Sequence, residues 1–155
     1  TDDAVAIERR LDAAWSAGDA TNLGSLIAAD LQLRGSARVT WVDERYLRDA
    51  RRSTREIEAA LLALSAHGNA DSAIPRQRVI DSYRLFMREH KDIAGYVAPD
   101  LAAWRYWSAV PDYVALMKSD ARQQYPSRLA IVAYLRQSPN GGQHLSLPQL
   151  GGAKQ

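Results

Sequence analysis

The sequence contains no cysteine and only three histidines among its 155 residues. Without cysteine the chain can form neither a disulfide framework nor a thiolate metal site, and a cysteine nucleophile is excluded as well. The longest strictly apolar runs are only a few residues long, whereas a membrane-spanning helix needs about 20 apolar residues. These absences exclude disulfide-stapled proteins, thiolate chemistry and a helical membrane span.

Motifs that position reactive groups by a fixed spacing are also missing. The chain has no Gly-x-Ser-x-Gly elbow, no phosphate-binding P-loop and no His-Glu-x-x-His zinc motif, so we expect no metal and no cofactor. One enzymatic alternative stays open, a small all-α enzyme with a carboxylate or histidine centre. Asp81, Glu89 and His90 would supply that centre if a cleft desolvated one of them.

The composition is that of an ordinary globular domain. Hydrophobic residues make up 46% of the chain and charged residues 25%, and 155 residues fit a single core. Residues 138–155 carry four glycines and two prolines without a helical apolar period, which is typical of a flexible tail. We predict one helical domain over residues 1–137, followed by a flexible tail over residues 138–155.

Apolar residues recur at spacings of three and four along most of the chain, which is the pattern of one face of an α-helix. The fold class predicted from this is an all-α domain of about six or seven helices with a long central helix. A weak alternation over residues 31–42 allows one short extended segment. Glycines and prolines divide the chain into predicted helices over residues 4–17, 19–34, 43–66, 75–90, 100–109, 112–124 and 126–136.

The segment 6–35 (AIERRLDAAWSAGDATNLGSLIAADLQLRG) resembles the opening of the NTF2-like, or SnoaL-like, α+β cone proteins. The resemblance rests on a helix, a tryptophan, a Gly-Asp pair, a second helix and an aspartate. It implies four or more long alternating strands further along the chain. Residues 43–137 show helical periods in their place, so we keep the all-α prediction and carry over no family residues.

The predicted central helix carries a polar feature opposite its apolar face. Arg45, Arg48, Arg52 and Arg55 fall within an arc of about 80° at 100° per residue. Guanidinium groups bind phosphates and carboxylates bidentately, so this arginine ladder predicts a candidate anion-binding strip. The other interpretation is a solvated face, with its arginines paired to acids at i,i+4 spacing in the pairs Glu44–Arg48, Arg45–Asp49 and Arg52–Glu56.

Aromatic residues crowd into one short region. Tyr96, Trp104, Tyr106, Trp107 and Tyr113 are five of the twelve aromatic residues in the chain. On a helix Trp104 and Trp107 share a face that Tyr106 does not, so part of the cluster is expected at the surface. Exposed tryptophan and tyrosine beside Arg105 are typical of a protein-binding hot spot. The alternative interpretation places both tryptophans in the core.

From these features we predict a non-catalytic helical interaction module of a bacterial type, an adaptor or accessory protein. It would bind a protein partner through Tyr96, Trp104, Arg105, Tyr106, Trp107 and Tyr113. The alternative is a nucleic-acid or polyanion binder that uses the arginine ladder, and leftover aromatic surface also favours a homo-oligomer. The start at Thr1 without a charged and apolar leader slightly favours a periplasmic protein with its signal peptide removed over a cytoplasmic one.

Overall fold

The computed structural model describes residues 1–141 and 143. Within this part of the chain all regular structure is helical and no strand occurs, which confirms the all-α fold class. The helix count is slightly above the expected six or seven. The α-helices are α1 (Asp2–Ala17), α2 (Leu23–Arg34), α3 (Val39–Val42), α4 (Thr54–Asn69), α5 (Arg76–Glu89), α6 (Ala98–Ala103), α7 (Val110–Lys118) and α8 (Tyr125–Gln137).

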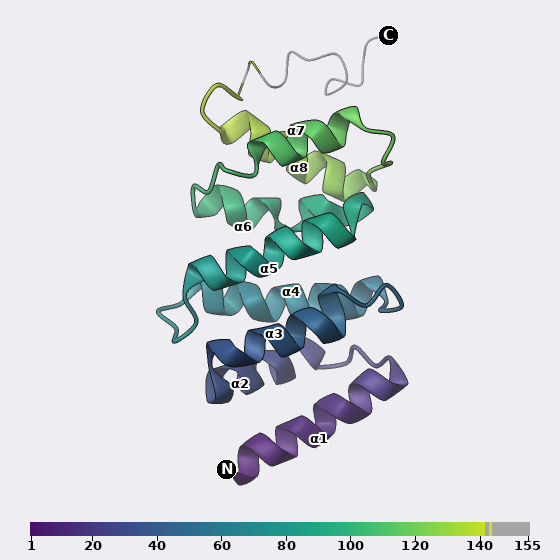
Figure 1. The fold of residues 1–155 in the computed structure, drawn as a ribbon, viewed down its shortest axis with the longest axis vertical. Helices are drawn as coiled ribbons and strands as arrows, with labels where there is room; N and C mark the ends of the chain where they lie inside the picture. Colours follow the sequence, from purple (N-terminus) through teal and green to yellow (C-terminus); the bar gives the residue numbers. More distant parts are fainter. Residues whose placement is uncertain (142, 144–155) are drawn as a thin grey trace. The chain divides into compact units, whose positions relative to one another are not determined.

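The helices group into two compact units, Thr1–Glu89 and His90–Gln155 (Figure 1). The single helical domain over residues 1–137 stays a prediction. Most of the predicted flexible tail, residue 142 and residues 144–155, lies outside the described residues. In the described residues, none of the helices combines the length and the apolar character that crossing a membrane requires.

The first helix forms and ends for local reasons that the sequence shows. Thr1 caps α1 by accepting a hydrogen bond from the Ala4 amide at 3.1 Å. Gly18 then takes the left-handed conformation at φ 64°, and the amide of Asp19 bonds back to the carbonyl of Ala14 at 2.9 Å. This helix ending is a Schellman motif, which is closed by two backbone hydrogen bonds. It favours glycine because a side chain is strained at positive φ. The predicted end of the first helix at residue 17 is confirmed.

Two predictions near the second helix are wrong. The second helix does not begin at residue 19, because the Asp19 carboxylate accepts from the Thr21 amide at 2.8 Å and the cap position of α2 falls on Asn22. The expected extended segment over residues 31–42 is also absent. Its residues continue α2, pass through a 3₁₀ turn, η1 (Ser36–Arg38), and enter α3. Leu31 and Val39, two residues of the weak alternation, are buried on two successive helices.

The prediction of one long central helix over residues 43–66 is wrong as well, because the chain leaves the helical conformation in the middle of this range. Residues Asp43–Leu47 form a π-helical turn, η2, and a turn follows before α4 begins at Thr54. Ser53 is the cap of α4. Its side chain accepts from the Glu56 amide while the Glu56 carboxylate accepts from the Ser53 amide. This reciprocal pair stabilises a helix start, so the apolar spacing spans two separate elements.

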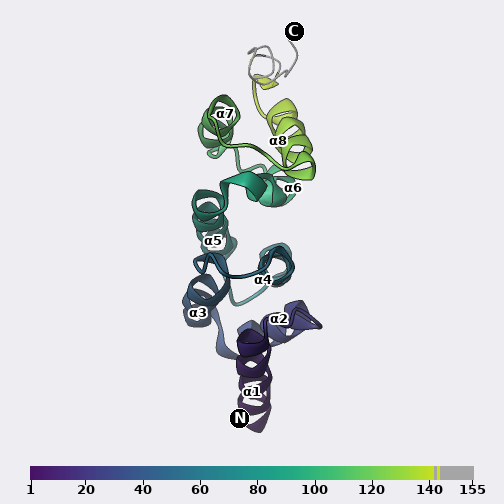
Figure 2. The ribbon, with the colours of Figure 1, turned by 90° about the vertical axis from the view of Figure 1, so that its right-hand side faces the viewer.

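In the first unit α4 lies between α2 and α5 and contacts both (Figures 1 and 2). The apolar core includes Leu23 and Ile27 of α2 and Leu64 of α4, all fully buried. His67 of α4 is buried too, and its ring nitrogens bond to Ser72 Oγ at 2.7 Å and to the Ala28 carbonyl at 3.0 Å. The His67 side chain therefore ties α4 to α2 as a structural group.

In the second unit α8 contacts the 3₁₀ segment η3 (Lys91–Val97), α6 and α7. The two segments approach closely at Gly95, whose amide donates to Ser127 Oγ at 2.7 Å. A Cβ atom at position 95 would lie 2.2 Å from the Ser127 carbonyl oxygen, so only glycine fits. Helices α6 and α7 end at Ala103 and Lys118, earlier than the predicted ends at residues 109 and 124.

Candidate functional site

The break before α4 divides the predicted arginine ladder. Arg45 lies in the η2 turn, Arg48 and Arg52 lie in the connection, and Arg55 lies in the first turn of α4. The four side chains therefore do not share one helix face, and the geometry predicted for the ladder is wrong. The Ser-x-x-Glu capping pattern at residues 53–56 is the sequence signal that marked the break.

Two ladder arginines instead stack on tryptophan rings, in an arrangement we call the Arg–Trp stack (Arg38, Trp41, Arg45, Trp15 and Arg52). The Arg38 guanidinium lies 3.8 Å from the centre of the Trp41 ring. Arg45 lies between two rings, 4.7 Å from Trp41 and 4.8 Å from Trp15. Arg52 lies 4.7 Å from Trp15. Such cation–π contacts stabilise by about 0.5–1 kcal/mol each when exposed and more when desolvated.

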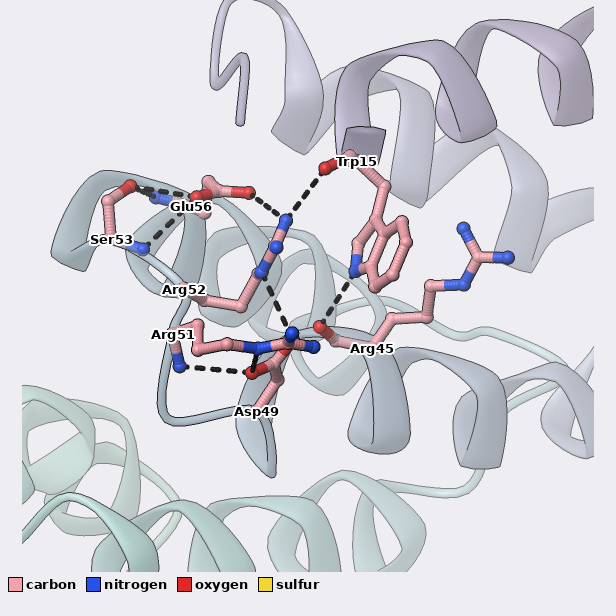
Figure 3. A network of polar contacts seen from close by, with 7 residues as sticks. All are labelled: Trp15, Arg45, Asp49, Arg51, Arg52, Ser53 and Glu56. Carbon is pink, nitrogen blue, oxygen red and sulfur yellow. Dashed lines mark hydrogen bonds and ion pairs between the residues drawn. The ribbon is translucent and has the colours of Figure 1, made fainter. Parts of the chain in front are cut away.

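Hydrogen bonds hold the stack in place (Figure 3). The Trp15 indole nitrogen donates to the Arg45 carbonyl at 3.3 Å, and Arg52 Nη1 donates to the Trp15 carbonyl at 2.8 Å. The same Arg52 nitrogen bonds Glu56 at 3.0 Å. Only 13% of the Arg52 side chain is exposed. Arg52 is thus a structural cation that joins the end of α1 to the start of α4.

Carboxylates compensate the charges of the stack. Asp30 is fully buried, and its two oxygens accept from Arg34 at 2.9 Å and Arg38 at 2.5 Å. Asp12 pairs with Arg45 at 3.1 Å, where the ladder hypothesis expected Asp49 to pair with it. These acids reduce the field that a phosphate would feel.

The remaining ladder residues are more exposed. Arg48 pairs with Glu44 at 2.7 Å, as the i,i+4 spacing predicted, and half of its side chain is exposed. Arg55 is exposed. Next to them the Asp49 carboxylate accepts from the side chain and the amide of Arg51, which lowers the pKa of Asp49 to about 2.

A buried tyrosine borders the stack. The Tyr46 ring meets the Trp41 ring edge-on with centroids 6.3 Å apart, and Tyr46 is fully buried. Its hydroxyl makes no hydrogen bond with the described residues. Burial, and to a lesser extent the nearby Glu56 carboxylate, raise the pKa of Tyr46 to about 12, while Arg45 and Arg52 oppose the shift.

The second unit holds the predicted aromatic surface, which contains what we call the aromatic loop (residues 104–107). Helix α6 ends before this loop in a Schellman motif, the same helix ending with two backbone hydrogen bonds that closes α1. The Tyr106 amide bonds to the Leu101 carbonyl at 2.8 Å and the Arg105 amide to the Ala102 carbonyl at 3.0 Å. The residue in the glycine position is Arg105, held at φ 55°. Arg105 is exposed, and Trp104, Tyr106 and Trp107 are partly exposed.

The aromatic loop is fixed from beneath by α8. Tyr134 is fully buried, and its hydroxyl donates to the Tyr106 carbonyl at 2.5 Å. The Trp107 ring packs on the Tyr134 ring at 5.2 Å. Five of the six residues predicted to bind a partner therefore keep some exposure, since Tyr96 is partly exposed as well.

Tyr113 is the exception among the predicted partner-binding residues. It is fully buried, donates its hydroxyl to the Ala94 carbonyl at 2.9 Å and packs on Tyr134 at 5.1 Å. In this structure Tyr113 cannot touch a partner, and we correct its assignment to a core residue. The reason is that α7 begins at Val110, which directs Tyr113 inward on the first turn.

The residues of the enzymatic alternative have accessible side chains. Asp81 and Glu89 are exposed, Asp81 accepts from Gln77 at 2.9 Å, and His90 is partly exposed. No group of three or more metal-ligating side chains occurs in the part of the chain that the structure describes. A desolvated acid of the kind that hypothesis requires is therefore not found among Asp81 and Glu89.

Comparison with protein-family models, with curated proteins and with solved structures finds no match for this chain. The site therefore has to be interpreted from its own chemistry. Sequence reasoning missed Trp15, Trp41 and Arg38 as members of the Arg–Trp stack. The four-residue spacing Trp41–Arg45 hinted at one contact, but Trp15 lies thirty positions from Arg45.

Proposed function

We propose that this chain is a non-catalytic helical interaction module that binds a protein partner through the aromatic loop and Tyr96. The observation that carries the proposal is Arg105, an exposed arginine at a helix end where glycine is favoured. A residue with a side chain costs about 1 kcal/mol more than glycine in the left-handed region. Backbone strain of this kind is concentrated at binding and catalytic sites.

The residue types around Arg105 support a protein partner. Tryptophan, tyrosine and arginine dominate protein-binding hot spots because they combine apolar area with a polar or charged end. The loop is also held in one conformation by Tyr134, so little conformational entropy is lost when it binds. A partner that fits would present a carboxylate for Arg105 beside an apolar pocket for Trp104 or Trp107.

The polyanion alternative has less support in the structure. Arg45 and Arg52 are stacked on tryptophan and paired with acids, and Arg48 is paired with Glu44. Binding of generic duplex DNA that falls steeply with salt and is lost in Arg55→Ala would favour this alternative over the proposed function.

The test uses the side chain and the backbone of Arg105 separately. Arg105→Gly keeps the helix ending and removes the side chain, so we expect higher stability, by about 1 kcal/mol, together with weaker binding of a cross-linked or co-purified partner. Arg105→Ala should weaken binding without the gain in stability. The exposed Arg122 of the same unit gives the matched control, because Arg122→Gly and Arg122→Ala should leave affinity within about threefold.

The same partner should lose affinity when a ring is removed. Trp104→Ala is expected to weaken binding at least tenfold, or about 1.4 kcal/mol, in titration calorimetry. If Arg105→Gly and Trp104→Ala both retained affinity within threefold while the chain stayed folded by circular dichroism, the aromatic loop would not be the binding surface.

A further inference from the structure

An open groove lies between α1 and α2, which contact each other and are neighbours in Figure 1. Its volume is about 350 Å³. Helix α1 contributes Asp3, Ala6, Ile7 and Arg10 to its lining, and α2 contributes Ala29, Gln32 and Leu33. The lining is therefore apolar in the middle, with a carboxylate and a guanidinium seven residues apart on α1.

The groove face of α1 differs from the face that packs on the protein. On the packed face, Glu8 and Asp12 pair with arginines of later elements, and Leu11 is buried. Asp3 and Arg10 are exposed on the groove face, and neither side chain has an ion pair or hydrogen bond with the rest of the described chain. Leu33 is 49% exposed, so apolar area accompanies the unpaired charges.

The arrangement of these groups is self-complementary. Asp3 and Arg10 lie two helical turns apart, about 10.5 Å along the axis at 1.5 Å per residue. Their midpoint falls between Ala6 and Ile7. An antiparallel second copy of α1, related by a two-fold axis at that midpoint, brings each Asp3 opposite an Arg10. The small side chains of Ala6 and Ala29 allow two helices to approach closely there.

We propose that the occupant of the α1–α2 groove is a second copy of this chain, giving a two-fold symmetric dimer through antiparallel α1 helices. Such an interface uses the same patch on both copies, so one charge pair of opposite sign forms twice. Ile7 and Leu33 supply the buried apolar area between the two Asp3–Arg10 pairs. This surface shares no residue with the aromatic loop, so the dimer and the partner interaction can be tested independently.

Charge reversal tests the dimer in the full 155-residue chain, with sedimentation velocity from about 1 µM to about 1 mM. We expect the wild-type chain to dimerise with rising concentration. Asp3→Arg sets two positive charges against each other in both pairs of the interface, and Arg10→Asp sets two negative charges against each other. Each variant should therefore weaken dimerisation at least tenfold, and the double variant D3R/R10D should restore it.

The sharpest arm mixes the two single variants. The D3R chain is positive at both positions and the R10D chain is negative at both, so the mixture should form a heterodimer although each variant alone dimerises at least tenfold more weakly than wild type. Asp2→Arg and Arg9→Asp are the matched controls, because these α1 neighbours are exposed and do not line the groove. They should change dimerisation by less than threefold.

Three results would overturn the proposal. They are a wild-type chain that stays monomeric over the whole concentration range, a D3R and R10D mixture that stays monomeric while wild type dimerises, and equal losses in the Asp2 and Arg9 controls. Circular dichroism of each variant confirms that α1 is folded, so a loss of helix is not mistaken for a loss of dimer. A dimer that forms while every aromatic-loop variant binds normally would leave this inference intact and overturn only the proposed function.

Discussion

The two units of the chain place tryptophan and arginine together in opposite ways. In the first unit, arginines cover the rings of Trp15 and Trp41, and acids neutralise the arginines. In the second unit the ring of Trp107 packs on Tyr134, and Arg105 is left exposed. The difference teaches that arginine density alone does not mark a binding surface. Under the proposed function, the binding surface is instead marked by an arginine that the fold leaves exposed at a cost in backbone strain.

The largest loss of stability is expected when a carboxylate that compensates the positive charges of the Arg–Trp stack is removed. Asp30→Ala removes the buried carboxylate that holds Arg38 against Trp41, and removing one partner of a buried pair costs about 3 kcal/mol or more. The free energy of unfolding from chemical denaturation measures this loss. Asp12→Ala, at a half-exposed acid of the same stack, should cost less than about 1 kcal/mol. Equal losses of unfolding free energy in the two variants would mean that Asp30 contributes no more to the stability of the stack than Asp12 does.

A smaller effect separates the buried tyrosines of the two units. Tyr134→Phe removes the hydrogen bond to the Tyr106 carbonyl and should cost about 1 kcal/mol. Tyr46→Phe removes a buried hydroxyl without a hydrogen-bond partner in the described chain, so its cost should be near zero or slightly negative. Thermal denaturation of both variants tests the contrast. A larger loss for Tyr46→Phe than for Tyr134→Phe would contradict it.

The ladder arginine that stacks on tryptophan rings and the one that is solvated should also differ in how much they contribute to stability. Arg45→Met removes a cation that lies between two rings and should cost about 1 kcal/mol. Arg48→Met removes an exposed ion pair with Glu44 and should cost less than about 0.5 kcal/mol. Chemical denaturation measures both changes, and a larger cost for Arg48 would show that ring stacking contributes little.

The last prediction is a pH dependence that belongs to the first unit. The pKa of Tyr46 is raised from 10.0 to about 12 in the folded chain. Its contribution to stability is complete below pH 10 and falls as the pH rises from 10 to 12, because the unfolded chain loses the proton first. Between pH 10 and pH 12 the wild-type chain should therefore lose stability relative to the Tyr46→Phe variant. An unchanged difference in alkaline denaturation would contradict the raised pKa.

Much of the fold could be predicted from local pattern. The all-α class, the end of the first helix at Gly18 and the proline-marked starts of α7 and α8 follow from spacing and capping residues. The break before α4 was missed because Tyr46, Ser53 and Ile57 keep one helical face across two elements. The Ser53 capping box would have revealed it.

The exposure of the candidate site was predicted in part, and its role in binding stays a prediction. Exposure of the aromatic region around Arg105 is found for five of the six residues, and Tyr113 is in the core because its helix starts at Val110. The strained conformation of Arg105 could not be predicted, since nothing in the local sequence favours arginine over glycine at a helix end.

The sequence by itself determined the helices, because apolar spacing and caps act between residues a few positions apart. Only the tertiary structure decided that Trp15 would lie against Arg45 and Arg52, and that Arg38 would share Asp30 with Arg34. Contacts such as Trp15–Arg45 join residues thirty or more positions apart, and their partners are selected by how the helices pack. The same packing left Arg105 exposed on its strained turn and the Asp3–Arg10 face of α1 uncovered within the described chain.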